Sequence, residues 1–119
     1  MAIPSGSGTE VLKHETTAGQ HSSAQTLLTV PTLHICTILS ITICNNNSVA
    51  GETFHLYFED ASNSGSALYL TKNTVLNNNA TFIWNDKLVL EAGDVLKLIT
   101  ADSSDLMTLT SYIDQNWEN

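Results

Sequence analysis

Four histidines are the side chains of this chain best suited to bind a metal ion or to transfer protons. No two of them have the HxH or HxxxH spacing that brings two imidazoles to one ion. Two of the four fall in a Ser/Thr-rich N-terminal stretch. We therefore expect no metal site and no cofactor, and imidazoles that are hydrogen-bonded or face solvent. The histidines are His14, His21, His34 and His55.

Two cysteines are the candidates for nucleophilic chemistry. Cys36 and Cys44 lie on the same face of one predicted strand, and eight residues at about 3.3 Å each separate them by about 26 Å. That distance excludes a disulfide between them and a shared metal ion. Neither cysteine has a lysine or arginine near it in sequence to lower its pKa. We expect buried thiols, as in a protein that folds in a reducing cytoplasm.

Serine and aspartate give no stronger indication of catalysis. The chain has no GxSxG motif, and its aspartates fall mostly at predicted turns, where Asp is a common residue. Asp102 and Asp105 share one loop, but two carboxylates are a weak indication of a calcium site. We predict that the protein is not an enzyme and has no catalytic residues.

Composition and charge restrict the partners of the protein. The chain has 119 residues, the size of one domain, and its 42% hydrophobic and only 13% charged residues indicate a folded protein with a weakly charged surface. Its formal net charge is −8, with four basic residues that do not cluster. Nucleic acids and anionic membranes require clustered cations, so we exclude both as partners. No apolar run approaches the length of a membrane span.

The stretch 34–44, HICTILSITIC, predicts the central strand of the fold. It has no Gly, no Pro and no formally charged residue, and its β-branched residues disfavour a helix. Alternation divides it into two faces. We expect the more apolar face to meet the core. That face comprises Ile35, Thr37, Leu39, Ile41 and Ile43.

Seven further strands are predicted, separated by polar turns, and no helix is expected. In the last strand Met107, Leu109 and Ile113 face one way, and Leu106, Thr108, Thr110 and Tyr112 face the other. The segments 87–90 and 94–101 are expected to form a hairpin. The pattern predicts an all-β domain, a single antiparallel β-sandwich or jelly roll of about eight short strands. The seven strands are 25–30, 53–59, 67–76, 81–84, 87–90, 94–101 and 106–114.

The N-terminal residues 1–24 are expected to form an extended arm outside the sandwich domain 25–114, and residues 115–119 a C-terminal tail. Glycines and Pro4 interrupt this polar stretch. It is either a flexible tail or an arm that becomes ordered on a partner. In the second case the residues that bind the partner are Ile3, Pro4, Val11 and Leu12.

Aromatic residues offer two further interpretations. Tyr57, Tyr69, Tyr112 and Trp117 are expected to be exposed. They are either a carbohydrate-binding platform or, as we prefer, a contact between subunits formed by Tyr57, Tyr112 and Trp117.

Three segments resemble small virion structural proteins of tailed bacteriophages, cyanophages in particular. IPSGSGTEVLK (residues 3–13) is similar to the start of such proteins. LLTVPTLHICTILSITICNNNS (27–48) resembles their strand pair, in which Val-Pro leads into a long apolar strand and an Asn/Ser loop. DKLVLEAGDVLKL (86–98) and SYID (111–114) are similar to their closing strands.

The resemblance implies a protein that is built into a phage particle in many copies. We expect a capsid decoration or cement protein that docks through its N-terminal arm. Its partner would be the major capsid protein or another virion protein, and it would form a homo-oligomer. One alternative is a neck, tail or fibre-attachment protein of the virion. An alternative from another class is a carbohydrate-binding module for host attachment.

Overall fold

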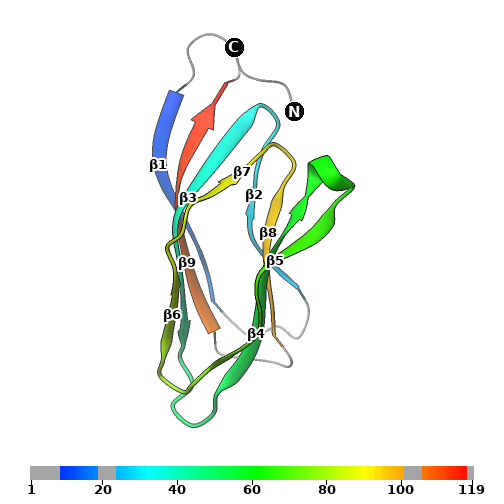
Figure 1. Ribbon diagram of the computed structural model, residues 1–119. Coiled ribbons are helices and arrows are strands. Elements are labelled where there is room, and N and C mark those ends of the chain that lie inside the picture. The colour runs from blue at the N-terminus through cyan, green and yellow to red at the C-terminus, as the bar shows by residue number, and fades with distance from the viewer. Residues whose placement is uncertain (1–8, 19–23, 101–105, 118–119) are drawn as a thin grey trace.

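The computed structural model describes residues 9–18, 24–100 and 106–117. In these residues the chain forms nine strands and one 3₁₀ turn (Figure 1). This confirms the predicted all-β class. The elements are β1 (Thr9–Thr17), β2 (Gln25–Thr29), β3 (His34–Asn45), β4 (Glu52–Asp60), η1 (Ala61–Asn63), β5 (Ser66–Leu76), β6 (Thr81–Trp84), β7 (Leu88–Leu90), β8 (Val95–Thr100) and β9 (Leu106–Asn116).

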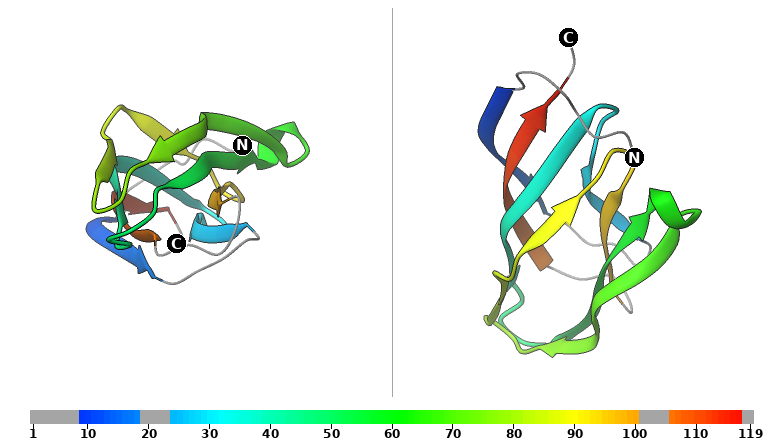
Figure 2. Two further views of the ribbon diagram at one scale, coloured as in Figure 1. Left: turned by 90° about the horizontal axis from the view of Figure 1, so that it is seen from below. Right: turned by 45° about the horizontal axis from the view of Figure 1, so that its top comes forward.

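The strands form two antiparallel sheets that face each other as layers (Figure 2). Sheet A has the order β1-β9-β3-β6, and β7 also pairs with β3. Sheet B has the order β2-β8-β4-β5. The pairs are nested along the chain, because β1 pairs with β9, β2 with β8, β3 with β6 and β7, and β4 with β5. This nested pairing is that of a jelly roll, one of the two architectures predicted from the sequence.

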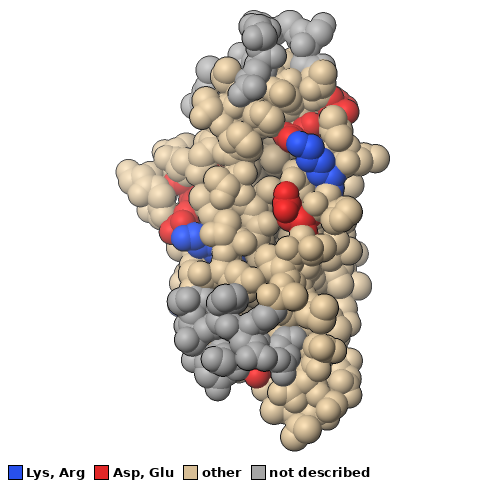
Figure 3. All heavy atoms as spheres, turned by 180° about the vertical axis from the view of Figure 1, so that it is seen from behind, with Lys and Arg blue, Asp and Glu red and all other residues tan. Residues whose placement is uncertain are grey.

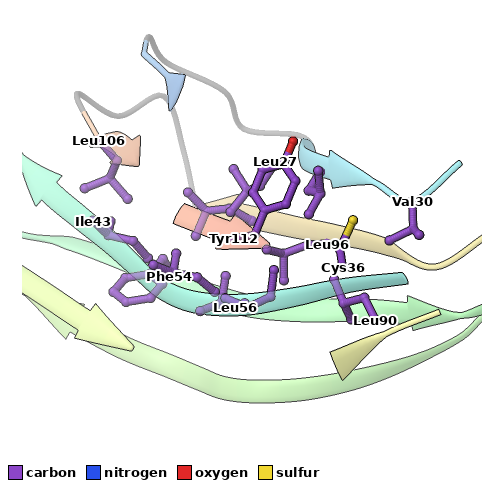
Figure 4. Packing of buried hydrophobic residues seen from close by; sticks show 14 of the residues in the cluster. Leu27, Val30, Cys36, Ile43, Phe54, Leu56, Leu90, Leu96, Leu106 and Tyr112 are labelled. Atoms are coloured by element: carbon purple, nitrogen blue, oxygen red, sulfur yellow. The ribbon is translucent and has the colours of Figure 1, made fainter. Parts of the chain in front are cut away.

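The hydrophobic core lies between the two sheets (Figure 4). Alternation places every second side chain of a strand in this layer, as in β8, where Leu96 and Leu98 are buried and Lys97 between them is not. Phe54 packs edge-on against Phe82 of the other sheet, with ring centroids 5.3 Å apart. Six core side chains are completely buried: Ile41, Ile43, Phe54, Leu56, Leu90 and Leu96.

Strand β3 is central in sheet A, as predicted, but its buried face changes midway. Ile38 pairs with Tyr112 and Ser40 with Ser111, so Leu39 is an extra residue in a β-bulge. A one-residue shift exchanges the two faces of a strand. The buried residues are consequently Cys36 and Ile38 before the bulge, and Ile41 and Ile43 after it.

The predicted core face of this stretch is therefore correct only after the bulge. Ile35 and Thr37 are half-buried and Leu39 is exposed, all on the outer side of sheet A. The bulge also separates the two cysteines, which we expected on one face. Cys36 is buried in the core, whereas Cys44 lies partly exposed on the outer side. The expectation of two buried thiols is correct for Cys36 alone.

The predicted hairpin of residues 87–90 and 94–101 is wrong. Strand β7 pairs with β3 in sheet A, and β8 pairs with β2 and β4 in sheet B. The turn between them crosses from one sheet to the other. The buried Asp94 holds this turn, because its carboxylate accepts hydrogen bonds from the backbone N–H groups of Glu91 at 2.8 Å and of Ala61 at 2.9 Å.

The N-terminal boundary of the sandwich also differs from the expectation. Nine residues assigned to the arm form β1, which pairs with β9 from Thr9↔Asn116 to Thr17↔Thr108. Strand β1 is an edge strand whose side chains are almost all exposed, so it lacks the burial pattern that reveals a strand in a sequence. At the other end β9 extends to Asn116, into the expected tail.

Candidate functional site

A cluster of ionisable side chains surrounds Asp114 at one end of sheet A. Lys13 Nζ donates a hydrogen bond to Asp114 Oδ2 at 2.7 Å, and His34 Nδ1 lies 2.7 Å from Asp114 Oδ1. Cys36 Sγ is 3.8 Å from the same Oδ1. The three adjacent strands β1, β9 and β3 contribute these residues, and the side chain of Asp114 is only 7% exposed.

The charges of this cluster determine its chemistry. Burial alone would raise the pKa of Asp114, but the hydrogen bonds and positive charges of Lys13 and His34 outweigh burial and hold this pKa below its ordinary value. Burial and the neighbouring Asp114 carboxylate raise the pKa of Cys36 to about 12. The thiolate is the reactive form of cysteine, so the Cys36 thiol is inert at neutral pH.

The arrangement joins three strands, and we refer to it as the Asp114 clamp. Asp114 accepts hydrogen bonds from Lys13 of β1 and from His34 of β3 at once. The ion pair with Lys13 ties the edge strand β1 to β9. In the described part of the chain, no group of three or more His, Cys, Asp and Glu side chains is placed to hold a metal ion.

A pocket of about 410 Å³ opens beside the clamp. Lys13 and Glu15 of β1 and Tyr112 of β9 line one side, and Leu28 and Thr29 of β2 line the other. Burial, followed by the charge of Glu15, raises the pKa of Tyr112 to about 12, so the phenol stays protonated. Figure 3 views the molecule from behind, where the charged side chains are few and the basic ones lie beside acidic ones.

The outer face of sheet A is apolar and exposed. The register places its side chains in rows across the sheet, such as Leu12, Ile113, Thr37 and Val89. Between the apolar side chains this face carries mainly Thr and Ser. Its exposed hydrophobic residues are Leu12 (75% exposed), Leu39 (44%), Ile83 (57%), Val89 (56%), Met107 (44%) and Leu109 (39%).

The outer face of sheet B has a different character. Tyr69 packs against Tyr57 with ring centroids 5.2 Å apart and against His55 at 5.9 Å. Lys72 Nζ lies 4.7 Å from the centroid of the Tyr69 ring, at a distance typical of a cation–π contact. This aromatic cluster is bordered by an ion pair between Lys97 and Glu59 at 2.9 Å.

Two of the four arm residues predicted to bind a partner, Val11 and Leu12, lie in β1. Val11 and Leu12 are 48% and 75% exposed, and they point to opposite sides of β1. Ile3 and Pro4 lie outside the described residues. Trp117 is partly buried, and its backbone N–H donates to the carbonyl oxygen of Leu33 at 2.9 Å.

The expected exposure of Tyr57 and Tyr112 is wrong. Tyr112 is 4% exposed and belongs to the core, because the face of β9 that carries it is the one directed inward. Tyr57 is 9% exposed, covered on the outer face of sheet B by its neighbour Tyr69. Neither ring is therefore available on the surface for the predicted contact between subunits.

Sequence reasoning also missed the Asp114 clamp. Lys13 is 101 residues from Asp114 and His34 is 80 residues from it. No local spacing links residues so far apart. The one local indication was that Asp114 ends an alternating stretch, at a position that shares the inward face with Tyr112.

No protein-family model matches the chain, and no curated protein sequence matches it significantly. Among solved structures, a subunit of the disulfide-linked pili of Bacillus endospore appendages is similar over 99% of this chain and 97% of its own, with 9% identity and a TM-score of 0.57. A chain of the acid-stable capsid of Helicobacter pylori bacteriophage KHP30 is similar over 94% of this chain and 95% of its own, with 11% identity and a TM-score of 0.56.

A third similar structure is the T13 particle of infectious bursal disease virus. The likeness covers 91% of this chain but 31% of the viral chain, with 11% identity and a TM-score of 0.55. At these identities the comparisons show the fold alone, a β-sandwich that this chain shares with a pilus subunit and with two capsid proteins. In the described residues, no helix is long and apolar enough to cross a membrane.

Proposed function

We propose that this protein is a non-enzymatic structural protein of a bacteriophage virion, and that it decorates the outside of the capsid as a cement protein. The observation that carries the proposal is the jelly roll, which aligns over nearly the whole of both chains with a chain of a phage capsid. The resemblance of residues 3–13, 27–48 and 86–98 to phage virion proteins supports the same assignment.

Docking takes place through the N-terminal segment. Residues 1–8 lead into β1 at the free edge of sheet A, and Leu12 of β1 is 75% exposed. The ion pair of Lys13 with Asp114 joins this edge strand to β9, and β9 pairs along its length with the central strand β3. A partner that binds the segment is thereby coupled to the centre of the sheet. The partner is the major capsid protein or another protein of the particle.

The chemistry of the Asp114 cluster supports a role without catalysis. A thiol with a pKa of about 12 is a poor nucleophile at neutral pH, and the carboxylate beside it is already paired with Lys13 and hydrogen-bonded to His34. Both features suit a structural clamp.

Immunogold labelling of purified particles tests the location. Gold distributed over the head is the expected result, and it should disappear when residues 1–8 are deleted from a chain that still folds. Gold at the neck or tail would replace the cement assignment by the alternative of a neck, tail or fibre-attachment protein. Particles that carry neither gold nor peptides of this chain would refute the virion assignment.

One observation favours a second candidate function, carbohydrate binding in host attachment. Tyr69 is 45% exposed and is flanked by His55, Tyr57 and Lys72, which together provide a ring face and polar groups for a sugar. A glycan array with the isolated protein tests this role. Binding that is lost in Tyr69→Ala would support it, and an array without signal would exclude it for the glycans present.

A further inference from the structure

The outer face of sheet A is apolar, as buried protein surfaces are, but its side chains are exposed to solvent in the single chain. Six hydrophobic side chains on it are 39% to 75% exposed. Soluble monomers rarely expose a contiguous apolar surface of more than a few hundred Å², and larger ones mark interaction sites. On β9 the outward residues Met107, Leu109 and Ile113 are more apolar than Thr108 and Thr110, which face the core.

The size of this face matches that of a stable protein interface. Strand β3 has twelve residues, and the sheet path is four strands wide. At about 3.3 Å per residue and about 4.8 Å per strand, the face measures about 40 Å by 19 Å, or about 750 Å². A standard interface buries about 800 Å² on each partner.

The distribution of charge on the outer face of sheet A indicates which kind of partner covers it. The chain carries a net charge of −8, so two copies repel each other wherever their carboxylates meet. Among the described residues that point outward from sheet A, Glu10 at the start of β1 is the single carboxylate, and its Oε1 accepts a hydrogen bond from Gln115 Nε2 at 3.0 Å. A basic partner would bind the more acidic surfaces of the molecule rather than this face. A face with one carboxylate, at its margin, is suited to a second copy of the same face.

We propose that a second copy of this chain packs on the outer face of sheet A, sheet against sheet. The same residues then serve both copies, as in an isologous twofold interface. Two such sheets pack about 10 Å apart with their side chains interdigitated. The inference goes beyond the proposed virion role and does not depend on it.

Sedimentation equilibrium of the isolated full chain tests the proposal. We expect the wild type to self-associate, and Leu109→Glu to weaken the association at least about 100-fold, because it buries a carboxylate at the centre of the face in both copies. Leu68→Glu is the matched control. Leu68 is 52% exposed on β5 of the other sheet, and the substitution changes the net charge equally. It should leave the association unchanged.

The native cysteines provide a second measurement that does not rely on a variant. Cys44 lies on the outer face of sheet A, opposite Met107, whereas Cys36 is buried and its thiol is inert. Alkylation of Cys44 should slow as the protein concentration rises through the range of association. In Leu109→Glu the rate should be independent of concentration.

Two results would overturn the proposal. One is a wild type that stays monomeric up to about 1 mM. The other is an association that Leu109→Glu leaves intact while Cys44 stays reactive. Neither result bears on the immunogold experiment, so a failure of this interface and a failure of the virion assignment are distinguishable.

Discussion

Replacing Thr110 by Val should stabilise the protein, although it removes a hydroxyl group from the structure. Thr110 is completely buried on the inward face of β9, and its Oγ1 has no hydrogen-bond partner in the described residues. A buried hydroxyl without a partner costs about 1–3 kcal/mol. Valine has nearly the same shape and a high strand preference, so it removes this cost without creating a cavity.

We expect Thr110→Val to raise the free energy of unfolding by about 1 kcal/mol. For a domain of this size that corresponds to an increase of about 4 °C in the melting temperature. Thermal and urea unfolding followed by circular dichroism measure both quantities.

The matched control is Thr108→Val, two residues earlier on the same inward face. Thr108 Oγ1 shares a hydrogen bond with Thr17 Oγ1 of β1. The same substitution there breaks a hydrogen bond and should lower the stability by about 1 kcal/mol. The reasoning is refuted if the two variants are destabilised equally.

Three further predictions concern the core, the clamp and the turns. Ile41→Asp should unfold the domain, since Ile41 is completely buried, and unchanged thermal melting would contradict the assigned core face. Because the pKa of Asp114 is lowered in the folded protein, its carboxylate stabilises the fold at pH values above its ordinary pKa of 3.8. This contribution is lost as the pH falls through the lower pKa of the folded state. Urea midpoints of Asp114→Asn should therefore change less than those of the wild type as the pH falls below about 4. Gly93→Ala should lower the free energy of unfolding by about 2 kcal/mol, because Gly93 has φ +89° and the new Cβ would lie 3.0 Å from Ala61 Cβ. Gly65→Ala, at φ +75° in open space, should lower it by about 1 kcal/mol. Equal urea midpoints of the two variants would contradict the predicted steric contact.

The sequence predicts strands well where one face is buried and the other is not. The segment 81–84 coincides with β6, and 34–44 differs from β3 by one residue, because alternating apolar residues and flanking Asn-rich turns mark both. Strand β1 was missed for the opposite reason. Its residues are exposed on both sides, so nothing in their hydrophobicity separates an edge strand from a tail.

The orientation of the strands was harder to predict than their position. In β9 both faces carry hydrophobic residues, and the inward face also carries the polar residues Thr108, Thr110 and Asp114. In β3 the bulge at Leu39 reverses the faces, and no Gly or Pro in the sequence marks it. Bulges and contacts between distant residues are properties of the assembled sheet, so alternation in one segment does not reveal them.

The pairing of β1 with β9 also determines how the molecule responds to force. Thr9 lies opposite Asn116, so the two outer ends of this strand pair are at the same end of the sandwich. Tension between the two ends of the chain would unzip the nine pairs of β1 and β9 one at a time, and would reach the ion pair of Lys13 and Asp114 partway along. Tension applied to the N-terminal segment along β1, with the body held, would instead shear all nine pairs together. A molecule anchored by its N-terminal segment is therefore strong when its body is dragged along the strand direction, and weak when β1 is peeled from β9.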